Sequence, residues 1–505
     1  MPPAGGRNTI LRKEATALKR ILILGGGASG IVAAIAAAEA ASADTRVVLL
    51  EKNPRIGKKL LATGNGRCNL DNDNIHPNCF FTTDRGTMSE MLTAMGEPLE
   101  WFRRHGLLCR SDEAGRIYPY SNQAADVLNL LLHWLETSGV EVRTECAVSA
   151  VRPKDSRWAV TLESGETIGA DAVICAMGGS AGPQFGTDGF GIRLAEQLGC
   201  DGAPQYPCLV SLQCRKAQVA GLSGIRAKAD AALYDGERFI HKESGEIQFT
   251  DYGLSGIAVM QLSGYLAPNS GIRKPEIRLD LFPHLTEADL TAVLQTHSRA
   301  LPHVTAGDFM TGLIHRRLGL AVWKAQKLGD EQRLISTLKA EEWLRLAQGF
   351  KAWRFTELEN TGWKNAQTTG GGIRLHQLER DTFMVKQTPG LYIVGETTDC
   401  AGSCGGFNLH WAFGSGILAG EAAAKQLGGK PGTAPRSPTK SAPAHRNSNR
   451  SVPRTEGKNA PQTTPKNSSR TSSKQGAPAG RQKPASRTKD GKKSAQKPAN
   501  HKKRK

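Results

Sequence analysis

The stretch "ILILGGGASGIVAAIAAAEA", residues 21–40, decides the fold. It is apolar and carries no charge before Glu39, and the basic pair Lys19 and Arg20 precedes it. Hydropathy alone therefore leaves a signal peptide, a membrane helix and a buried element open. Most of the run is Gly and Ala, however, and these residues contribute little to insertion into lipid. The pattern inside the run is more informative than its hydropathy.

The glycines of this stretch read G-x-G-x-x-G, directly after a short strand-like run and before an Ala-rich helical pattern. This order is typical of a dinucleotide-binding unit. Gly25 would permit the tight turn, Gly27 would let backbone amides approach a pyrophosphate, and Gly30 would let the helix pack closely on the strand. A second strand, 46–50, ends at Glu51, which is placed to accept the ribose hydroxyls. The sequence therefore predicts a nucleotide site and no membrane span.

The overall composition separates a folded part from a basic tail. A chain of 505 residues is long enough for about three domains. Its ten cysteines form no C-x-x-C pair, which favours reduced cytoplasmic thiols over a disulfide framework or a metal site. The formal net charge is +19, but residues 431–505 carry 20 Lys and Arg against 2 Asp and Glu, whereas residues 1–430 carry 46 against 45. The positive charge thus belongs to the tail.

The tail has almost no large apolar residues and is rich in Pro, Ser, Gly and Lys, so we expect residues 429–505 to be disordered. Two interpretations of it remain open. The tail could contact nucleic acid or another polyanion through phosphates, or it could be a solubilising extension. It contains no aromatic residue with which to stack on bases.

Two further segments look like parts of the same nucleotide fold. Residues 140–177 read as successive strands with turns near Asp155 and Gly165, and Gly178 follows the last of them. Residues 391–394 read as a strand, which a glycine-rich loop and a helix over about 408–427 follow. The second helix would bring another positive helix end to the site.

Together these stretches resemble the FAD-dependent flavoproteins of the BaiN-like, aminoacetone-oxidase-like family, which have a glutathione-reductase-like FAD-binding fold. The segments that carry the resemblance are "IGKKLLATGNGRCNL" (56–70), "VICAMGG" (173–179), "GEIQFTDYGLSG" (245–256) and "GLYIVGE" to "GGFNLHWAFGSG" (390–416). It extends over about residues 20–428. The fold it implies is α/β, with a Rossmann-like FAD-binding domain interrupted by an inserted substrate domain. The expected parts are an N-terminal extension (1–19), the FAD-binding domain in two pieces (20–204 and 361–428), a β-barrel-like, β-rich insertion (205–284), a helical subdomain (285–360) and the disordered basic tail (429–505).

The resemblance also implies which residues bind FAD, and it places each group against one part of the cofactor. The helix after Asn408 would direct donors at the flavin pyrimidine, where charge develops on hydride uptake. The implied contacts are Gly25, Gly27, Ala28, Ser29 and Gly30 at the pyrophosphate, Glu51 and Lys52 at the adenosine, Val148 at the adenine, Ala176, Met177 and Gly178 over the dinucleotide, Thr63, Gly64, Asn65, Gly66, Arg67, Cys68 and Asn69 along the isoalloxazine, Gly395 and Glu396 at the ribityl chain, and Gly406, Phe407 and Asn408 at the pyrimidine.

Three cysteines near these positions have two interpretations each. Cys400 and Cys404 depart from the usual loop of the family and could form a redox dithiol, but C-x3-C is not the spacing of thiol oxidoreductases. We favour small buried thiols. Cys68 is interpreted as a loop thiol packed under the flavin rather than a nucleophile.

Other polar residues near the predicted flavin are also ambiguous. Arg67 could bind a substrate carboxylate or stabilise reduced flavin, or it could satisfy carbonyls of its own loop. His410 and Trp411 are expected to be packing residues rather than an acid–base pair. The sequence names no catalytic residue and no metal ligand.

The predicted function is that of an FAD-dependent oxidoreductase that acts on a small organic substrate by hydride transfer at flavin N5. No second G-x-G-x-x-G follows a strand, so NADH or NADPH, the candidate electron donor, would dock transiently. Reduction of a conjugated carbon–carbon double bond and oxidation of an amine or alcohol both remain open. The alternative is an RNA-associated flavoprotein whose basic tail binds RNA.

Overall fold

The computed structural model describes residues 18–430. The predictions for the N-terminal extension and the basic tail therefore fall almost entirely outside the described residues. Within the described part, no helix is both long and apolar enough to cross a membrane.

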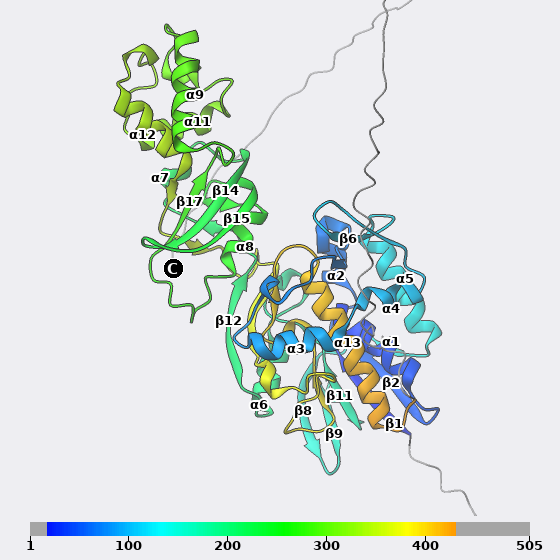
Figure 1. Cartoon of the computed structure of the whole chain (residues 1–505). Helices are drawn as coiled ribbons and strands as arrows, with labels where there is room; N and C mark the ends of the chain where they lie inside the picture. The colour runs from blue at the N-terminus through cyan, green and yellow to red at the C-terminus, as the bar shows by residue number, and fades with distance from the viewer. Residues whose placement is uncertain (1–17, 431–505) are drawn as a thin grey trace, which may run out of the picture. The chain divides into compact units, whose positions relative to one another are not determined.

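A five-stranded parallel sheet forms the centre of the nucleotide fold, in the order β21-β11-β1-β2-β7 (Figure 1). β1 runs between β11 and β2, so the chain reverses its direction of winding there and leaves a crevice at the carboxyl ends of these strands. The predicted α/β fold is confirmed. The strands are β1 (Lys19–Leu24), β2 (Thr45–Leu50), β7 (Glu141–Arg143), β11 (Ala172–Cys175) and β21 (Leu391–Ile393).

Two small-residue helices lie side by side on this sheet. α1 (Ala28–Ala40) is the Ala-rich run that follows the glycines, and α13 (Phe407–Gln426) is the long helix at the end of the described chain. A Cβ atom added at Gly416 or Gly420 would overlap backbone carbonyl oxygens of α1, so the two helix backbones touch. The apolar, uncharged character of residues 21–40 is therefore that of a buried strand and helix.

The remaining elements of this domain surround the parallel sheet. An antiparallel β-meander turns at Asp155 (φ 54°) and at Gly165 (φ 88°), as the sequence predicted. The elements are α2 (Lys58–Ala62), β3 (Asp71–Asn72), β4 (Phe80–Phe81), α3 (Arg85–Met95), α4 (Pro98–Arg104), β5 (Cys109–Ser111), β6 (Arg116–Pro119), α5 (Ala124–Thr137), β8 (Val148–Lys154), β9 (Arg157–Leu162), β10 (Thr167–Ala170), α6 (Phe190–Gln197) and β22 (Ala401–Gly402), with short 3-10 turns at Thr63–Gly66, Pro77–Cys79, Pro183–Phe185, Leu375–Gln377 and Gly395–Thr397.

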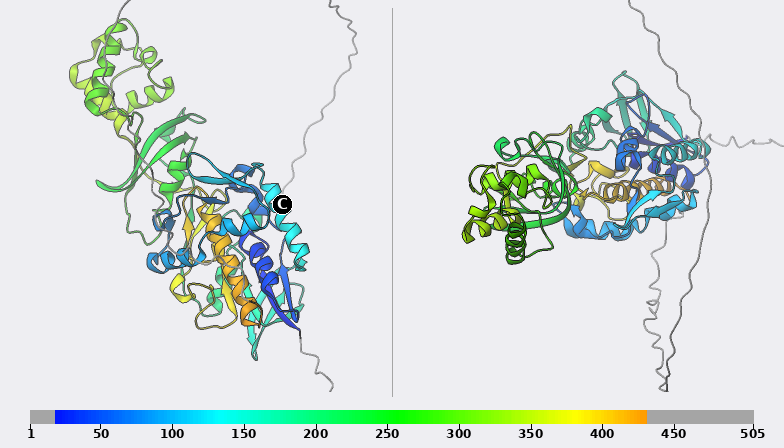
Figure 2. Two further views of the ribbon diagram at one scale, coloured as in Figure 1. Left: turned by 45° about the vertical axis from the view of Figure 1, so that its right-hand side comes forward. Right: turned by 90° about the horizontal axis from the view of Figure 1, so that it is seen from above.

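An insertion leaves and re-enters this domain through an antiparallel ribbon of β12 (Gly202–Cys208) and β20 (Thr368–Ile373). It has its own hydrophobic core and contains a seven-stranded sheet, with helices gathered at one end of it (Figures 1 and 2). Its elements are β13 (Leu212–Gln213), α7 (Lys216–Val219), β14 (Arg226–Asp235), β15 (Arg238–Phe249), β16 (Gly253–Ser255), α8 (Ile257–Ser263), β17 (Pro275–Asp280), α9 (Glu287–Ala300), α10 (Ala306–Phe309), α11 (Arg316–Ala325), a 3-10 turn (Ile335–Thr337), α12 (Ala340–Lys351), β18 (Trp353–Phe355) and β19 (Glu359–Asn360).

The end of the expected helical subdomain differs from the prediction. Residues 353–360 include two strands, β18 and β19, at the two edges of the seven-stranded sheet. Trp353 and Phe355 are buried and Arg354 between them is exposed, which is the alternation of a strand. This three-residue alternation directly follows a strong helical pattern. The sequence therefore predicted the helix but not the strand.

Candidate functional site

A cavity of about 430 Å³ lies at the carboxyl ends of β1, β2 and β11. Segments far apart in the sequence meet there, including the glycine loop, the end of α2 and the start of α13. The structure brings together thirteen of the predicted site residues in its lining, namely Gly25, Gly27, Ala28, Ser29, Glu51, Lys52, Thr63, Val148, Ala176, Met177, Gly178, Glu396 and Asn408.

Ten predicted residues do not line this cavity. A Cβ atom at Gly30 would overlap the carbonyl oxygen of Gly25, so Gly30 serves the close packing of helix on strand. A Cβ atom at Gly406 would overlap the carbonyl oxygen of Asp71, so Gly406 serves a close backbone contact as well. The other eight are Gly64, Asn65, Gly66, Arg67, Cys68, Asn69, Gly395 and Phe407. For all twenty-three residues, contact with FAD remains a prediction.

The start of α1 suits a pyrophosphate group. Gly27 is the N-cap residue of α1, and no side chain caps the free N–H groups of the first turn. A Cβ atom at Gly27 would meet nothing within 4 Å, so the cavity is open at this backbone position. Uncapped N–H groups at the positive end of a helix are a suitable site for an anion. The residues present therefore fit a dinucleotide.

Glu51 is buried and held in place by backbone and side-chain amides. Its Oε2 atom accepts a hydrogen bond from the Gly26 amide at 2.8 Å. Its Oε1 atom accepts from the amide N–H of Asn53 at 2.8 Å and from the Asn53 side chain at 2.6 Å. Oε1 thus uses both of its lone pairs, whereas Oε2 keeps one, which leaves an acceptor for a ribose hydroxyl. These bonds orient the carboxylate before a ligand arrives.

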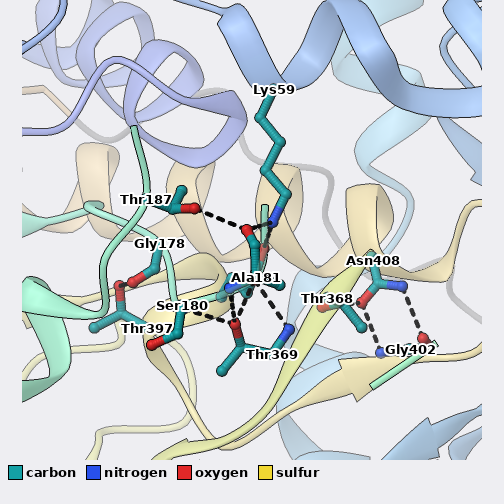
Figure 3. Close-up of polar contacts among 11 residues, drawn as sticks. Lys59, Gly178, Ser180, Ala181, Thr187, Thr368, Thr369, Thr397, Gly402 and Asn408 are labelled. Carbon is teal, nitrogen blue, oxygen red and sulfur yellow. Dashed lines mark hydrogen bonds and ion pairs between the residues drawn. The ribbon is translucent and has the colours of Figure 1, made fainter. Parts of the chain in front are cut away.

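A polar network joins three other walls of the cavity (Figure 3). The Lys59 ammonium donates to Glu396 Oε2 at 2.7 Å and to the Ala181 carbonyl at 3.1 Å. Thr369 Oγ1 donates to Glu396 Oε1 at 2.8 Å and accepts from the amides of Ser180 and Ala181 at 2.8 and 2.9 Å. The network therefore ties α2, the loop after β11 and β20 together, and one N–H donor of Lys59 has no partner in it.

The start of α13 is fixed by the side chain of Asn408. Its Oδ1 atom accepts from the Gly402 amide at 2.8 Å, and its Nδ2 atom donates to the Gly402 carbonyl at 2.7 Å (Figure 3). The N-cap residue Gly406 has a φ of 106° and provides no side-chain cap. Trp411, one turn on, lines the cavity and donates to Thr398 Oγ1 at 2.9 Å. A second uncapped helix end thus lies at the wall of the cavity.

Of the cysteines near the site, Cys68 and Cys400 are buried, and Cys404 is partly buried. All ten cysteines lie in the described part of the chain, and all are free. Burial raises the pKa of Cys68 and of Cys404 to about 12, and it raises the pKa of Cys400 well above its usual range. Thiols with such pKa values stay protonated and are poor nucleophiles. The structure thus favours the interpretation of Cys400 and Cys404 as packing thiols, and Cys400 lines the cavity.

The Arg67 and His410 side chains contact neighbouring groups of the protein. Arg67 Nε donates to the Gly64 carbonyl at 3.1 Å, and the guanidinium lies 4.6 Å from the centroid of the Tyr118 ring. This geometry favours the loop-supporting interpretation of Arg67. His410 is buried, and its Nδ1 atom lies 2.8 Å from Asp71 Oδ1, which agrees with a packing role.

The sequence did not point to several cavity residues. Lys58 and Lys59 lie in the segment 56–70 that carries the family resemblance. Their position directly after Gly57 is the sequence feature that could have identified them as cavity residues. No sequence motif marked the loop 185–188 as part of the cavity. The cavity residues that were missed are Leu24, Gly26, Leu50, Asn53, Arg55, Gly57, Lys58, Lys59, Leu60, Cys146, Ala147, Ser149, Glu163, Phe185, Gly186, Thr187, Asp188, Phe190, Gln367, Thr368, Leu409 and Ala412.

A dinucleotide cavity at the switch point of a parallel sheet, with two uncapped helix ends at its walls, defines the class of the protein: it is an FAD-dependent oxidoreductase. The chain belongs to the HI0933-like protein family, whose Rossmann-domain profile matches residues 19–422.

Comparison with known proteins found the following similarities. The 3-dehydro-bile acid delta(4,6)-reductase of Clostridium scindens is 37% identical over 414 residues, which cover 81% of this chain and 100% of that protein. The ribosomal RNA dihydrouridine synthase of Escherichia coli is 27% identical and covers 78% of this chain and 95% of that protein. The crystal structure of 3-ketosteroid-delta4-(5alpha)-dehydrogenase from Rhodococcus jostii is 17% identical, with a TM-score of 0.41 over 83% of this chain and 99% of that one.

Proposed function

We propose that this protein reduces a carbon–carbon double bond conjugated to a carbonyl group, with NADH or NADPH as the electron donor. The observation that carries the proposal is the 37% identity to the bile acid reductase over the whole length of that protein. The Δ4 double bond of a 3-oxo steroid is conjugated to its carbonyl. The double bond that is lost when uridine becomes dihydrouridine is also conjugated to a carbonyl, so the names of both relatives denote the same kind of chemistry.

The residues at the cavity would bind and orient the cofactor. When bound and reduced by NADH or NADPH, the flavin would supply the hydride that is transferred to the substrate. Gly27 and the first turn of α1 would hold the pyrophosphate, and Glu51 would hold the ribose. The start of α13 would direct its N–H groups at the flavin pyrimidine, where negative charge is stabilised.

A conjugated reduction also requires a donor at the substrate carbonyl. Saturation adds a hydride to the β-carbon and a proton to the α-carbon, and negative charge builds on the carbonyl oxygen in between. Lys59 lines the cavity and has one N–H donor beyond its bonds to Glu396 and Ala181. We infer that this donor polarises the carbonyl group, while the Glu396 carboxylate keeps the ammonium in position.

The visible absorbance of the purified protein tests the proposal in the absence of oxygen. NADH or NADPH should bleach the flavin band, and a cyclic enone added afterwards should restore it. A flavin that NADH and NADPH leave yellow but that an amine or alcohol bleaches would identify an oxidase and contradict the proposal.

A second candidate function is reduction of uracil in RNA. Two relatives support it, the ribosomal RNA dihydrouridine synthases of Escherichia coli and Haemophilus influenzae, at 27% and 25% identity. The basic composition of residues 431–505 suits an RNA substrate as well. Incubation of the reduced protein with ribosomal RNA, followed by mass spectrometry of the nucleosides, should show dihydrouridine if this candidate is correct and none if it is wrong.

A further inference from the structure

Arginine and tyrosine side chains gather on the surface beside the loop 63–69. We call Arg67, Leu108, Arg110, Tyr118 and Tyr120 the Arg–Tyr patch. Four of these residues are exposed, whereas Tyr118 is only 5% exposed and lies under the Arg67 guanidinium. Leu108 and Tyr120 are 67% and 57% exposed, which makes them the most exposed large hydrophobic side chains among residues 18–430. The Tyr120 amide donates to the Leu108 carbonyl at 2.8 Å, so the two residues are neighbours. Exposed apolar groups that lie together mark an interaction surface.

Two guanidinium groups of the patch lie over aromatic rings. The Arg67 guanidinium is 4.6 Å from the centroid of the Tyr118 ring, and the Arg110 guanidinium is 5.0 Å from the centroid of the Tyr120 ring. Arg110 on β5 is also paired across the strands with Tyr118 on β6. Among the described residues, neither guanidinium has a carboxylate within ion-pair distance, whereas many other arginines of the protein do. The patch therefore presents two positive charges without counter-ions.

The patch continues to the edge of the flavin cavity. Arg67 Nε donates to the Gly64 carbonyl, and the Tyr118 ring packs against Gly64, 3.4 Å from where a Cβ atom would stand. Thr63, the residue before Gly64, lines the cavity. A chain-like ligand that lies across the patch would thus have one part near the flavin cavity.

We infer that the Arg–Tyr patch binds single-stranded RNA. An exposed aromatic ring beside guanidinium groups that have no carboxylate partner offers a stacking face for a base and partners for its phosphates. The excess of Lys and Arg in residues 431–505 attracts the same polyanion, which favours RNA over a protein partner. The stacking face needs unpaired bases, which favours single strands over duplexes. This inference rests on the RNA-directed candidate function and names the surface that it would use.

Fluorescence anisotropy of a labelled oligouridylate of about 20 nucleotides, mixed with the full-length FAD-loaded protein, tests the inference. Tyr120→Ala should weaken binding by about 5- to 150-fold, because one stacked base contributes that much. Tyr120→Phe should keep wild-type affinity, since the ring remains. Arg110→Gln should weaken binding and lower the salt dependence by about one phosphate contact. Phe239→Ala is the matched control, because Phe239 is 55% exposed on β15 and should not alter binding.

An affinity for Tyr120→Ala within twofold of the wild-type value would overturn the inference. An unchanged RNA affinity together with a lower molar mass of Tyr120→Ala in light scattering would overturn it too, since the patch would then be a contact between copies of the chain. Flavin absorbance and reduction of a small enone should be the same in all variants. Loss of RNA binding with intact enone reduction separates this inference from the proposed function, and RNA binding without dihydrouridine formation would contradict only the second candidate function.

Discussion

Glu421 on α13 is a carboxylic acid whose charge opposes folding. Burial raises its pKa to about 7, and the nearby Glu39 adds to this effect while Arg104 lowers the pKa. Because the pKa in the folded protein lies above the ordinary value of 4.5, stability is full in acid and is lost as the pH rises through about 7.

Replacement of Glu421 by Gln should therefore stabilise the protein in base and not in acid. At about pH 8 we expect a gain of about 1 kcal/mol, less than the full pKa shift implies because the group is partly exposed. At about pH 4, below the ordinary pKa of 4.5 at which the unfolded chain titrates, the change should be close to zero. Thermal unfolding of the FAD-loaded protein at both pH values measures this, with exposed Glu136→Gln as the control. An equal effect of Glu421→Gln at both pH values would contradict the prediction.

Two glycines of the fingerprint should respond differently to the same substitution. Gly27→Ala places a methyl group in open cavity space, so the protein should fold and bind FAD about tenfold more weakly. Gly30→Ala drives a methyl group into the Gly25 carbonyl, so it should lower stability by about 1 to 3 kcal/mol or prevent folding. Flavin fluorescence titration and thermal unfolding measure the two effects. The same response in both variants would contradict the assigned roles.

Residue roles that depend on local backbone geometry could be predicted from the sequence, and those that depend on distant contacts could not. Gly25, Gly27 and Glu51 belong to one short unit whose spacing implies its shape. Lys59 is recognisable as a site residue only once Glu396, more than 300 positions away, lies 2.7 Å from it. The isoalloxazine loop was placed by resemblance alone, and six of its seven residues lie outside the cavity lining.

At the scale of elements, the contact between α1 and α13 depends on small residues. Gly420→Ala would place a methyl group against the Ala33 carbonyl and push the helices apart, so we expect a loss of about 1 to 3 kcal/mol in unfolding free energy. Gly86→Ala is the control, because Gly86 lies in the first turn of α3 with only a distant neighbour, and it should be neutral or slightly stabilising. Chemical denaturation measures both variants. A neutral Gly420→Ala would show that the helices can separate without cost.

The Thr369 hydroxyl is the junction through which β20 holds the loop after β11. Thr369→Val leaves the amides of Ser180 and Ala181 without their acceptor, so it should weaken FAD binding and cost about 1 to 3 kcal/mol of stability. Thr369→Ser keeps the hydroxyl and should retain most of both properties. Flavin titration and thermal unfolding of the two variants provide the measurement. A loss in Thr369→Ser that equals or exceeds the loss in Thr369→Val would contradict the prediction, because the methyl group would then contribute at least as much as the hydroxyl.

Element boundaries could be predicted where a segment shows a single periodicity, and they could not be predicted where two patterns meet. The turns of the β-meander and the ends of α13 lie within about one residue of their expected positions, because turn residues and glycines mark them in the sequence. β12 and β20 were not foreseen as a ribbon, since Gly370, Gly371 and Gly372 give no alternating pattern. Only pairing with a strand more than 160 positions earlier makes those glycines a strand.

At the scale of the whole molecule, the folded part and the basic tail should separate functionally. A chain that ends at residue 430 should keep FAD and reduce a small enone at the wild-type rate, because the cavity lining lies within residues 24–412. It should bind RNA more weakly, with a much smaller dependence on salt. Filter binding at two salt concentrations, with turnover in parallel, measures this. Loss of enone reduction on truncation would show that the tail takes part in catalysis.

The contact between α1 and α13 also governs when this protein can finish folding during its synthesis. A ribosome that adds about 5 to 20 residues per second would make α13 some 20 to 80 s after α1. During that interval the Ala-rich face of α1 has no partner and β11 lacks β21. The insertion, with a core of its own, can fold in the meantime. We therefore expect nascent chains to depend on chaperones until the last described helix emerges, and to capture FAD only after that point.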